Sequence, residues 1–451
     1  MTGVDAARSG GRRVRRLADW DAAALRSLAA THDTPLYVVD PARVRANYRR
    51  LRDALGRQVA PDRRVRVAYA AKANCSPAVL DALRSAGAEV EVASAAELSA
   101  VRTAGFPPER VRYTAVNPPG RELDALVRYH RETGGPAAVT AGARDTLDRL
   151  ADRGYDGPLA LRVRPDAGVG HHDGVVTGTD RGFGIALAEA DRVLAAADRR
   201  FDVVGLHAHV GSGVLEDDLD DHGDALARVG ALARQVTAGA SRPDAGGPAL
   251  DLNLEFVDLG GGLGVPYWAT EAPLDPDRAA ATLLSAVEGV DTDVDAVVEP
   301  GRYLAADAGV LLTRVNTVRP GGESETEPPT VVGVDAGLHT LVRPAMFDTG
   351  HPVRSLAPDA ADRPATRATV VGPVCSSADR LCTARPLARP ERGDLVAVGT
   401  AGAYGVELAS RFHGRPLPTE VAAPDLDGPD GAVDAPEGRV VREDRREGDT
   451  Q

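Results

Sequence analysis

The chain contains almost no lysine: among the 53 lysines and arginines in its 451 residues, Lys72 is the only lysine. Arginine can replace lysine wherever only charge or solubility is needed, but a guanidinium stays protonated and cannot condense with an aldehyde. Lys72 is therefore a candidate Schiff-base residue. A leftover surface lysine is the alternative. The flanking sequence argues against it, because a strand-like run over 65–72 is followed by a helix start at 74–77.

Cysteines and long apolar runs are also scarce. The three cysteines, Cys75, Cys375 and Cys382, are too few and too unevenly spaced for a disulfide framework, and none has paired metal-ligand spacing. We therefore expect a reducing cytoplasm and no metal. No apolar run reaches 18 residues, and the arginine-rich N-terminus lacks the apolar stretch of a secretory signal, so we expect no membrane span.

Acidic residues outnumber basic ones, 66 to 53, which gives a net charge of −13. This charge makes nucleic acid and anionic membranes poor partners. An acidic, lysine-poor composition is also expected of a protein from a salt-loving organism. A GC-biased genome that converts lysine codons to arginine codons is the alternative, and both causes can act together.

Short β-branched runs alternate with helical stretches through the first two thirds of the chain. Eight such units over about 240 residues predict a (β/α)8 barrel of the TIM type, with a doubly wound open sheet as the alternative. The barrel is favoured because glycine and charged motifs recur at the ends of many strands. The predicted strands lie near 65–72, 89–94, 110–116, 137–141, 159–164, 203–210, 255–259 and 294–299.

After Glu299 the pattern changes to short β runs between Pro- and Gly-rich turns, near 310–318, 330–334, 368–371 and 394–398. These runs predict a C-terminal β-sandwich or β-barrel domain, completed by an early strand at 35–39. A helix is expected over 17–30 and another over 41–57. The predicted division is an N-terminal arm and helix (1–34), a strand joining the β domain (35–44), the barrel (45–305), the β domain (306–421) and an acidic, disordered tail (422–451).

Further motifs follow the sixth and seventh predicted strands. His207 and His209 share one strand face, because side chains repeat every two residues. Such a pair is more often structural than catalytic, and a metal site there lacks an obvious third ligand. Gly260, Gly261 and Gly262 expose backbone N–H groups where barrels commonly bind phosphate, although a tight turn is the alternative.

The eighth strand ends in Glu299, which is followed by Pro-Gly-Arg302. An acid that emerges from an apolar strand needs a cation or a hydrogen-bond donor. Arg302 is one candidate partner, and the protonated ring nitrogen of a bound cofactor is the other. In the β domain, Cys375 and Tyr404 lie in turn-like segments, where a single cysteine is usually a small buried hydrophobe.

Taken together, residues 35–420 resemble the fold-type III pyridoxal-phosphate decarboxylases, and most of all the diaminopimelate decarboxylase group. The resemblance rests on ordered segments rather than on any single motif. These segments are Tyr-Ala-Ala-Lys-Ala-Asn (69–74), His-Val-Gly-Ser-Gly (209–213), the glycines 260–262, Glu-Pro-Gly-Arg (299–302), Val-Asp-Ala-Gly (334–337) with Arg-Pro-Ala (343–345), Cys375 and Tyr404.

The resemblance implies pyridoxal 5'-phosphate as the cofactor. Lys72 would be its covalent anchor, His209 would stack on its ring and Glu299 would pair with the ring nitrogen, which favours decarboxylation over racemisation. The other implied cofactor contacts are Ser212, Gly260, Gly261, Gly262, Pro300, Gly301, Arg302 and Tyr404.

The resemblance also implies that Cys375 is the catalytic proton donor and comes from a partner subunit, so that a homodimer shares its active sites. The implied substrate contacts are Arg302, Arg343, Phe347, Ser376 and Tyr404. Two of these depart from the family pattern. Ser376 stands where the family usually has a glutamate that holds the distal ammonium, and Phe347 stands where it has a tyrosine.

Loss of a charge-assisted hydrogen bond costs about 1.5–3 kcal/mol, so these two departures bear on substrate identity more than on the chemistry. Ser377 or Asp379 could partly replace the missing glutamate. The implied function is decarboxylation of meso-2,6-diaminopimelate to L-lysine and CO2, the last step of lysine biosynthesis. The alternatives are a paralogous decarboxylase of another amino acid with a rebuilt distal pocket, and a pyridoxal-phosphate-binding regulator without activity.

Overall fold

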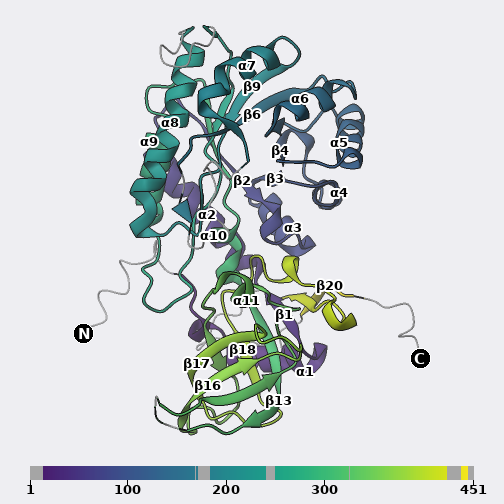
Figure 1. Ribbon diagram of the computed structural model, residues 1–451, viewed down its shortest axis with the longest axis vertical. Coiled ribbons are helices and arrows are strands. Elements are labelled where there is room, and N and C mark those ends of the chain that lie inside the picture. The colour runs from purple at the N-terminus through teal and green to yellow at the C-terminus, as the bar shows by residue number, and fades with distance from the viewer. Residues whose placement is uncertain are drawn as a thin grey trace.

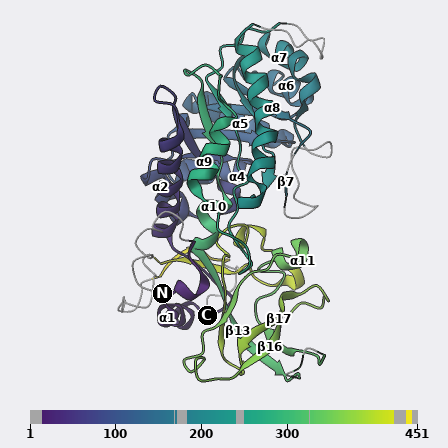
Figure 2. The same ribbon diagram turned by 90° about the vertical axis from the view of Figure 1, so that its left-hand side faces the viewer.

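The computed structural model describes residues 14–167, 169–170, 183–239, 249–322, 324, 326–423 and 438–444. They form two parts, one above the other in Figure 1: a barrel of strands wrapped by helices, and a domain built mainly of sheet. In the view turned by 90°, α10 (Arg302–Ala305) lies where the barrel meets the sheet domain (Figure 2).

Eight parallel strands make the barrel. Each pairs with its neighbours in the order β5-β4-β3-β2-β12-β11-β9-β6, and an additional β5–β6 pairing closes the ring. This closure confirms the predicted (β/α)8 barrel and excludes the open sheet. The strands are β2 (Val65–Ala70), β3 (Glu89–Val92), β4 (Val111–Ala115), β5 (Ala138–Ala141), β6 (Pro158–Arg164), β9 (Asp202–His207), β11 (Phe256–Asp258) and β12 (Asp295–Val298). Three two-residue strands lie beside them: β7 (Val169–Gly170), β8 (Ile185–Ala186) and β10 (Gly211–Ser212).

Helices follow the barrel strands and cover their outer side (Figure 1). They are α3 (Pro77–Ser85), α4 (Ala95–Thr103), α5 (Gly120–Thr133), α6 (Arg144–Ala151), α7 (Ala190–Asp198), α8 (Leu219–Thr237), α9 (Pro276–Ser285) and α10. Short 3-10 turns are η1 (Leu17–Asp19), η2 (Ala71–Ala73), η3 (Pro108–Arg110), η5 (Leu187–Glu189), η6 (Glu216–Asp218), η7 (Ala306–Ala308), η8 (Val406–Leu408) and η9 (Phe412–Gly414).

Local sequence sets the helix starts. α2 (Pro41–Gln58) begins after Asp40, whose carboxylate accepts from the N–H groups of Ala42 and Arg43. Asp21 caps α1 (Ala22–His32) in the same way. The helix predicted over 17–30 is therefore split into η1 and α1, because Asp21 starts a new helix.

The sheet domain has the order β17-β16-β14-β13-β1-β19-β20, with β18 joining β13 to β15. The early strand β1 (Leu36–Val39) runs antiparallel to β13 (Gly309–Arg319) and parallel to β19 (Thr419–Ala422), so segments far apart in the sequence meet in one sheet. The remaining strands are β14 (Thr330–Val334), β15 (Val353–Ser355), β16 (Ala365–Val371), β17 (Arg380–Ala388), β18 (Leu395–Val398) and β20 (Arg439–Arg442); the short helix α11 (Arg343–Phe347) follows β14.

The predicted tail needs a correction. β20 lies inside the stretch 422–451 that was expected to be disordered, yet it pairs antiparallel with β19. Arg442 explains the pairing in part, because it forms a salt bridge with Glu407 at 2.6 Å. Residues 424–437 and 445–451 lie outside the described part of the chain.

The N-terminal arm that the sequence predicts within 1–34 is held to the fold at Arg15. Arg15 is buried, its Nη1 donates to Asp40 at 2.8 Å, and its backbone N–H donates to Asp307 at 2.9 Å. Asp307 accepts from Arg43 and Asn47 as well. A buried carboxylate with several donors ties the N-terminal segment, α2 and η7 together. Residues 1–13 lie outside the described part.

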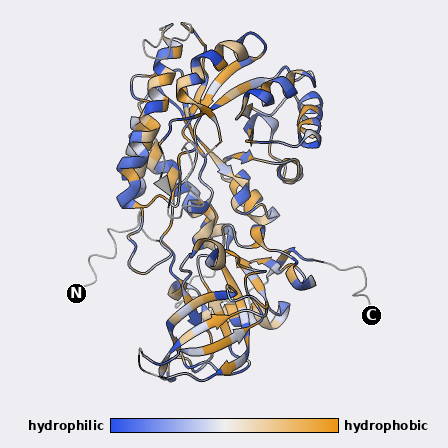
Figure 3. Cartoon of the chain, viewed as in Figure 1, coloured by the Kyte–Doolittle hydropathy of each residue, from blue (hydrophilic) through white to orange (hydrophobic). Residues whose placement is uncertain are grey.

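Apolar side chains fill the space between the barrel strands and their helices, and smaller clusters fill the sheet domain. Figure 3 shows hydrophobic colour along the strands and hydrophilic colour on the outer helices. Within the described ranges, no helix has both the length and the apolar composition needed to cross a membrane. The predicted domain boundaries themselves stay a prediction.

Candidate active site

A small cavity opens at the carboxyl ends of the barrel strands, next to the sheet domain. Parallel barrels present their loops at this end, so side chains from many strands meet there. The sheet domain contributes Tyr404, whose backbone N–H donates to the Ala73 carbonyl at 2.8 Å. The lining residues are Ala70, Lys72, His209, Gly211, Ser212, Gly213, Gly262, Leu263, Glu299, Gly301, Arg302 and Tyr404.

Lys72 lies in η2, directly after β2, and its Nζ is 3.6 Å from Oε2 of Glu91. The Glu91 carboxylate raises the pKa of Lys72 against the opposing effect of burial. Burial in turn raises the pKa of Glu91 to about 7, although Lys72 lowers it. The sequence analysis missed Glu91. An acid that points inward from the short strand Glu-Val-Glu-Val (89–92) was the available signal.

Glu299 is buried after β12 with two other titratable residues. Its Oε2 is 3.2 Å from His207 Nε2, and ligand atoms of His207, Asp258 and Glu299 all lie within 4.8 Å of one another. Burial lowers the pKa of His207 to about 3, so this imidazole is neutral and donates through Nε2. Burial raises the pKa of Asp258 to about 7 and also raises that of Glu299.

The Oε1 atom of Glu299 has no hydrogen-bond partner among the described residues. A buried carboxylate oxygen without a partner is costly, so a donor is expected to approach it from the cavity. Of the two partners considered from the sequence, Arg302 instead donates to Tyr267 Oη at 2.9 Å and to Ser212 Oγ at 3.4 Å. This geometry favours a ligand donor. The grouping of His207, Asp258 and Glu299 is a candidate metal cluster different from the pair of His207 and His209 considered from the sequence. The expectation of no metal stays a prediction.

The glycine loop after β11 packs too closely for side chains. A Cβ on Gly261 would lie 2.2 Å from the Glu299 carbonyl oxygen, and Gly260 and Gly262 have positive φ angles of 67° and 99°. The Gly261 N–H donates to His209 Nδ1 at 3.2 Å, which leaves the His209 Nε2 to carry the proton, because burial lowers the pKa of this imidazole. The loop therefore fixes His209 at the cavity wall.

Tyr267, which the sequence analysis missed, contacts two arginines, and one of them lines the cavity. The Arg302 and Arg343 guanidiniums lie 5.7 and 4.9 Å from the centre of the Tyr267 ring, and His351 contacts the ring edge-on at 4.9 Å. Burial alone would raise the pKa of Tyr267, but the two arginines outweigh it and the net shift is downward. The arginines come from α10 and α11, and no motif connects them in the sequence.

The predicted residues of the Cys375 segment lie elsewhere. Cys375 and Ser376 are exposed and do not line the cavity that Lys72 lines. Asp379 is buried, and its carboxylate accepts from the N–H groups of Leu338 at 2.6 Å and Val374 at 2.7 Å. Both oxygens of Asp379 already accept from the loop backbone, and its suggested role at a distal ammonium stays a prediction.

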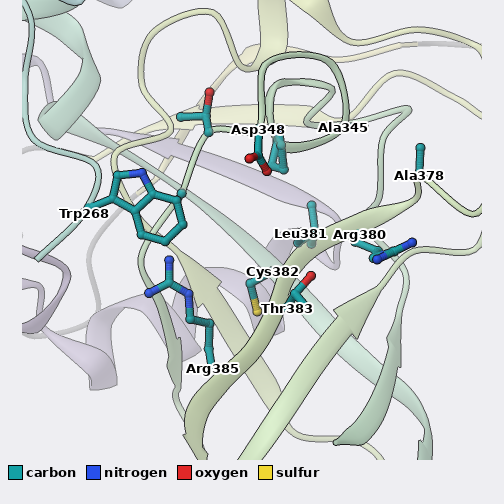
Figure 4. A pocket seen from close by; sticks show the side chains of 12 residues that line it. Trp268, Ala345, Asp348, Ala378, Arg380, Leu381, Cys382, Thr383 and Arg385 are labelled. Atoms are coloured by element: carbon teal, nitrogen blue, oxygen red, sulfur yellow. The ribbon is translucent and has the colours of Figure 1, made fainter. Parts of the chain in front are cut away.

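Phe347 is half-buried in α11, and Figure 4 shows a separate pocket beside that helix. Trp268, Asp348 and Arg385 surround this pocket, and the Arg385 guanidinium lies 4.0 Å above the Trp268 ring. None of the predicted site residues lines it. Of these residues, the structure brings together Lys72, His209, Ser212, Gly262, Glu299, Gly301, Arg302 and Tyr404 around the cavity, whereas Arg343, Phe347, Cys375 and Ser376 lie outside its lining.

The cavity fits a cofactor that carries an aldehyde, a basic ring nitrogen and a phosphate. It offers a primary amine, a buried carboxylate oxygen without a donor, and a glycine loop that a Cβ would obstruct. Fold and site together define a barrel enzyme for such a cofactor.

Comparisons with known proteins agree. The pyridoxal binding domain of the pyridoxal-dependent decarboxylases matches residues 42–306. A diaminopimelate decarboxylase from Methanothermobacter thermautotrophicus is 36% identical over 402 residues, or 87% of each chain. One from Pseudomonas aeruginosa is 35% identical and covers 88% of this chain and 89% of its own. The crystal structure of Helicobacter pylori diaminopimelate decarboxylase complexed with L-lysine aligns with a TM-score of 0.77 at 26% identity, covering 93% and 96% of the two chains.

The chain therefore belongs to the pyridoxal-dependent decarboxylases, and its cofactor is pyridoxal 5'-phosphate. The family resemblance inferred from the sequence is confirmed. The individual roles assigned to the site residues stay predictions.

Proposed function

We propose that this enzyme decarboxylates meso-2,6-diaminopimelate to L-lysine and CO2, completing lysine biosynthesis. The observation that carries the proposal is Arg343. It is 2% exposed, it forms no salt bridge within the described part of the chain, and its Nε has no hydrogen-bond partner there. A buried guanidinium needs an anion, and a substrate with a second carboxylate supplies one.

This argument separates diaminopimelate from simple diamino acids. Ornithine and lysine carry no distal carboxylate, so they would leave the Arg343 guanidinium without an anion. The relatives named diaminopimelate decarboxylase at 36% and 35% identity support the same choice.

The bound cofactor supplies an electron sink that accepts the electron pair left when the α-carboxylate departs. Lys72 is proposed to anchor the cofactor, with Glu91 orienting the Nζ atom from 3.6 Å. Glu299 would accept a hydrogen bond from the protonated ring nitrogen at its free Oε1, while His207 holds Oε2. His209 and Tyr404 would pack against the ring, and Gly262 lines the cavity where the phosphate would bind, while Gly260 and Gly261 let the loop pack closely against Ala208 and Glu299.

The remaining predicted cofactor contacts are Ser212, Pro300, Gly301 and Arg302. Ser212, Gly301 and Arg302 line the cavity, and the Pro300 carbonyl accepts from the Ala70 N–H at 3.3 Å. A Cβ on Gly301 would lie 3.2 Å from the Tyr404 hydroxyl, so this glycine lets the sheet domain approach the barrel.

We propose that Cys375 protonates the substrate carbon in the active site of a second copy, so that the active unit is a homodimer. Support comes from its position, because the thiol is exposed and does not line the cavity beside Lys72 in its own chain. Leu408 and Phe412, on the segment that packs near Cys375, expose 41% and 51% of their surface, which suits a contact face.

Mixing two inactive variants tests this arrangement. Lys72→Arg and Cys375→Ala subunits that exchange at random should recover about one quarter of wild-type activity, because half of the dimers are mixed and each of these has one intact site. A mixture without activity, although subunit exchange is complete, would refute shared sites. A cytoplasmic location and adaptation to high salt are likewise proposals, supported by the cysteine count and the net charge of −13.

The alternative is a paralogous decarboxylase with a rebuilt distal pocket, and Ser376 favours it. Its Oγ accepts from the Ala378 N–H at 3.2 Å, and a hydroxyl cannot supply the ion pair that the family glutamate gives. A regulator without activity is less well supported, because Lys72 and Glu299 are both at the cavity.

The deciding experiment measures CO2 release from meso-diaminopimelate, ornithine, arginine and lysine, in low and in molar salt. We expect release from diaminopimelate. Release from ornithine or arginine alone would refute the proposed substrate, and release from none would favour the regulator. Equal activity and stability in both salt conditions would refute salt adaptation.

A further inference from the structure

The exposed thiol of Cys375 has an imidazole partner that no sequence motif indicated. Its Sγ lies 3.2 Å from Nε2 of His413, and both residues are exposed. The two come from different segments, since Cys375 follows β16 and His413 lies in η9. This spacing allows a hydrogen bond between the thiol and the imidazole.

Several contacts hold the pair in place. Asp379 fixes the Cys375 loop through the Val374 N–H, and Arg415 Nη2 donates to the Pro373 carbonyl at 3.4 Å. The Phe412 ring lies 4.7 Å from the His413 ring. His413 itself has a φ of 61°, a left-handed conformation that is uncommon for a residue other than glycine.

The charged side chains near His413 have other partners, and the His413 ring pairs with Cys375. The carboxylate of Asp379 is engaged by two backbone N–H groups, Arg415 is a cation, and Arg411 pairs with Asp444. His339 also lies nearby, and burial lowers its pKa, so it is neutral.

We infer that His413 is a positioning residue that returns a proton to Cys375 after each turnover; this inference rests on the proposed decarboxylation with Cys375 as proton donor. Replacing a carboxylate by hydrogen consumes one proton, and that proton must enter from water. In the donor step the S–H bond breaks, the C–H bond forms and the S–H electron pair stays on sulfur as a thiolate.

His413 then restores the thiol. The imidazole takes a proton from water on Nε2, which leaves a hydroxide ion for the solvent to neutralise, and passes that proton to Sγ, so that the N–H bond breaks, the S–H bond forms and the imidazole returns to its starting state. Both side chains are exposed in the single subunit, which places the pair at the surface that faces the second copy.

The test uses His413→Ala and the conservative His413→Gln, with the cofactor bound. We expect kcat for diaminopimelate to fall about 100-fold with little change in KM, a loss typical of removing one proton-transfer group. Added imidazole should restore at least a tenth of the lost rate in His413→Ala, which a purely structural residue would not allow. A loss of kcat that imidazole does not reverse, or an unchanged kcat, would overturn the inference.

A second readout needs no turnover. Iodoacetamide labelling of each cysteine, followed by mass spectrometry, should show Cys375 reacting about 10-fold more slowly in both variants. Cys75 and Cys382 are internal references, because burial raises the pKa of each thiol. An unchanged labelling rate at Cys375 would refute the thiol–imidazole pair. If the wild-type protein decarboxylates none of the amino acids, the proposed function fails, and labelling still decides the pair.

Discussion

Replacing Arg343 by methionine separates substrate recognition from folding. The Arg343 guanidinium is buried, its one hydrogen bond to a described residue is to Thr349 Oγ1 at 3.4 Å, and its other contact is the Tyr267 ring. If it binds the distal carboxylate, its loss removes a charge-assisted hydrogen bond that contributes about 1.5–3 kcal/mol. Converted at 1.4 kcal/mol for each factor of ten, the expected fall in kcat/KM for diaminopimelate is about 10- to 100-fold.

The thermal midpoint of Arg343→Met should not fall together with kcat/KM. Methionine has a similar length and no charge, so removing a buried cation that lacks an anion should leave the thermal midpoint unchanged or raise it. The assays are CO2 release at several substrate concentrations and thermal unfolding without substrate. A fall in kcat/KM of less than about twofold, or an equal fall for ornithine, would refute the assigned role.

Arg63 is the matched control. It is also a buried arginine, but its guanidinium donates to the carbonyls of Val287, Val290 and Val294, before the start of β12 and at the opposite end of the barrel from the cavity. Arg63→Met removes a donor from three buried carbonyls, of which Val287 keeps a second donor in the Val290 N–H, so it should lower the thermal midpoint and leave kcat/KM unchanged. The two variants should therefore show opposite patterns.

Four further predictions follow from the site. Borohydride reduction should trap the cofactor on the one tryptic peptide that contains Lys72, and Lys72→Arg should abolish trapping; a label only at the N-terminus would contradict the anchor. Gly261→Ala places a Cβ 2.2 Å from the Glu299 carbonyl oxygen and should weaken cofactor binding measured by fluorescence titration. In the control variant Gly56→Ala, the Cβ enters open space in α2, and the free energy of unfolding should rise by about 0.5–1 kcal/mol. Burial raises the pKa of Asp258 from 3.8 to about 7, so folding takes up a proton between these pH values. The contribution of this group to stability is therefore lost as the pH rises from 4 to 7. Asp258→Asn should flatten the pH dependence of the thermal midpoint over this range, and an unaltered slope would contradict the argument. Ser376→Glu should lower KM for diaminopimelate, and an unchanged KM would mean that another group already holds the distal ammonium.

Much of the fold could be predicted because its signals are local. All eight barrel strands were placed in the correct order, since each is a β-branched run followed by a helical stretch. β20 was missed because Arg-Val-Val-Arg (439–442) is too short to indicate a strand without its partner β19. The break between η1 and α1 was missed because the side chain of one residue, Asp21, decided it.

The candidate site likewise contains residues that the sequence indicated and residues that it did not. Lys72, Glu299 and the glycine loop were recognisable because each follows a strand in a short motif. Glu91, Tyr267 and His413 were not, because nothing in their local sequence distinguishes them and their partners lie far away along the chain. The backbone contacts of Asp379 were not recognisable for the same reason, since its two donors come from separate segments.

The sequence by itself determined the barrel and the family and predicted the anchor, because strand periodicity, ordered motifs and the retention of a single lysine can be read along the chain. Only the tertiary structure decided the electrostatics. Burial sets the pKa of Asp258 and His207, and the meeting of α10 and α11 brings Arg302 and Arg343 to one tyrosine ring. Desolvation and distance depend on what surrounds a side chain in space, and the order of residues does not reveal them.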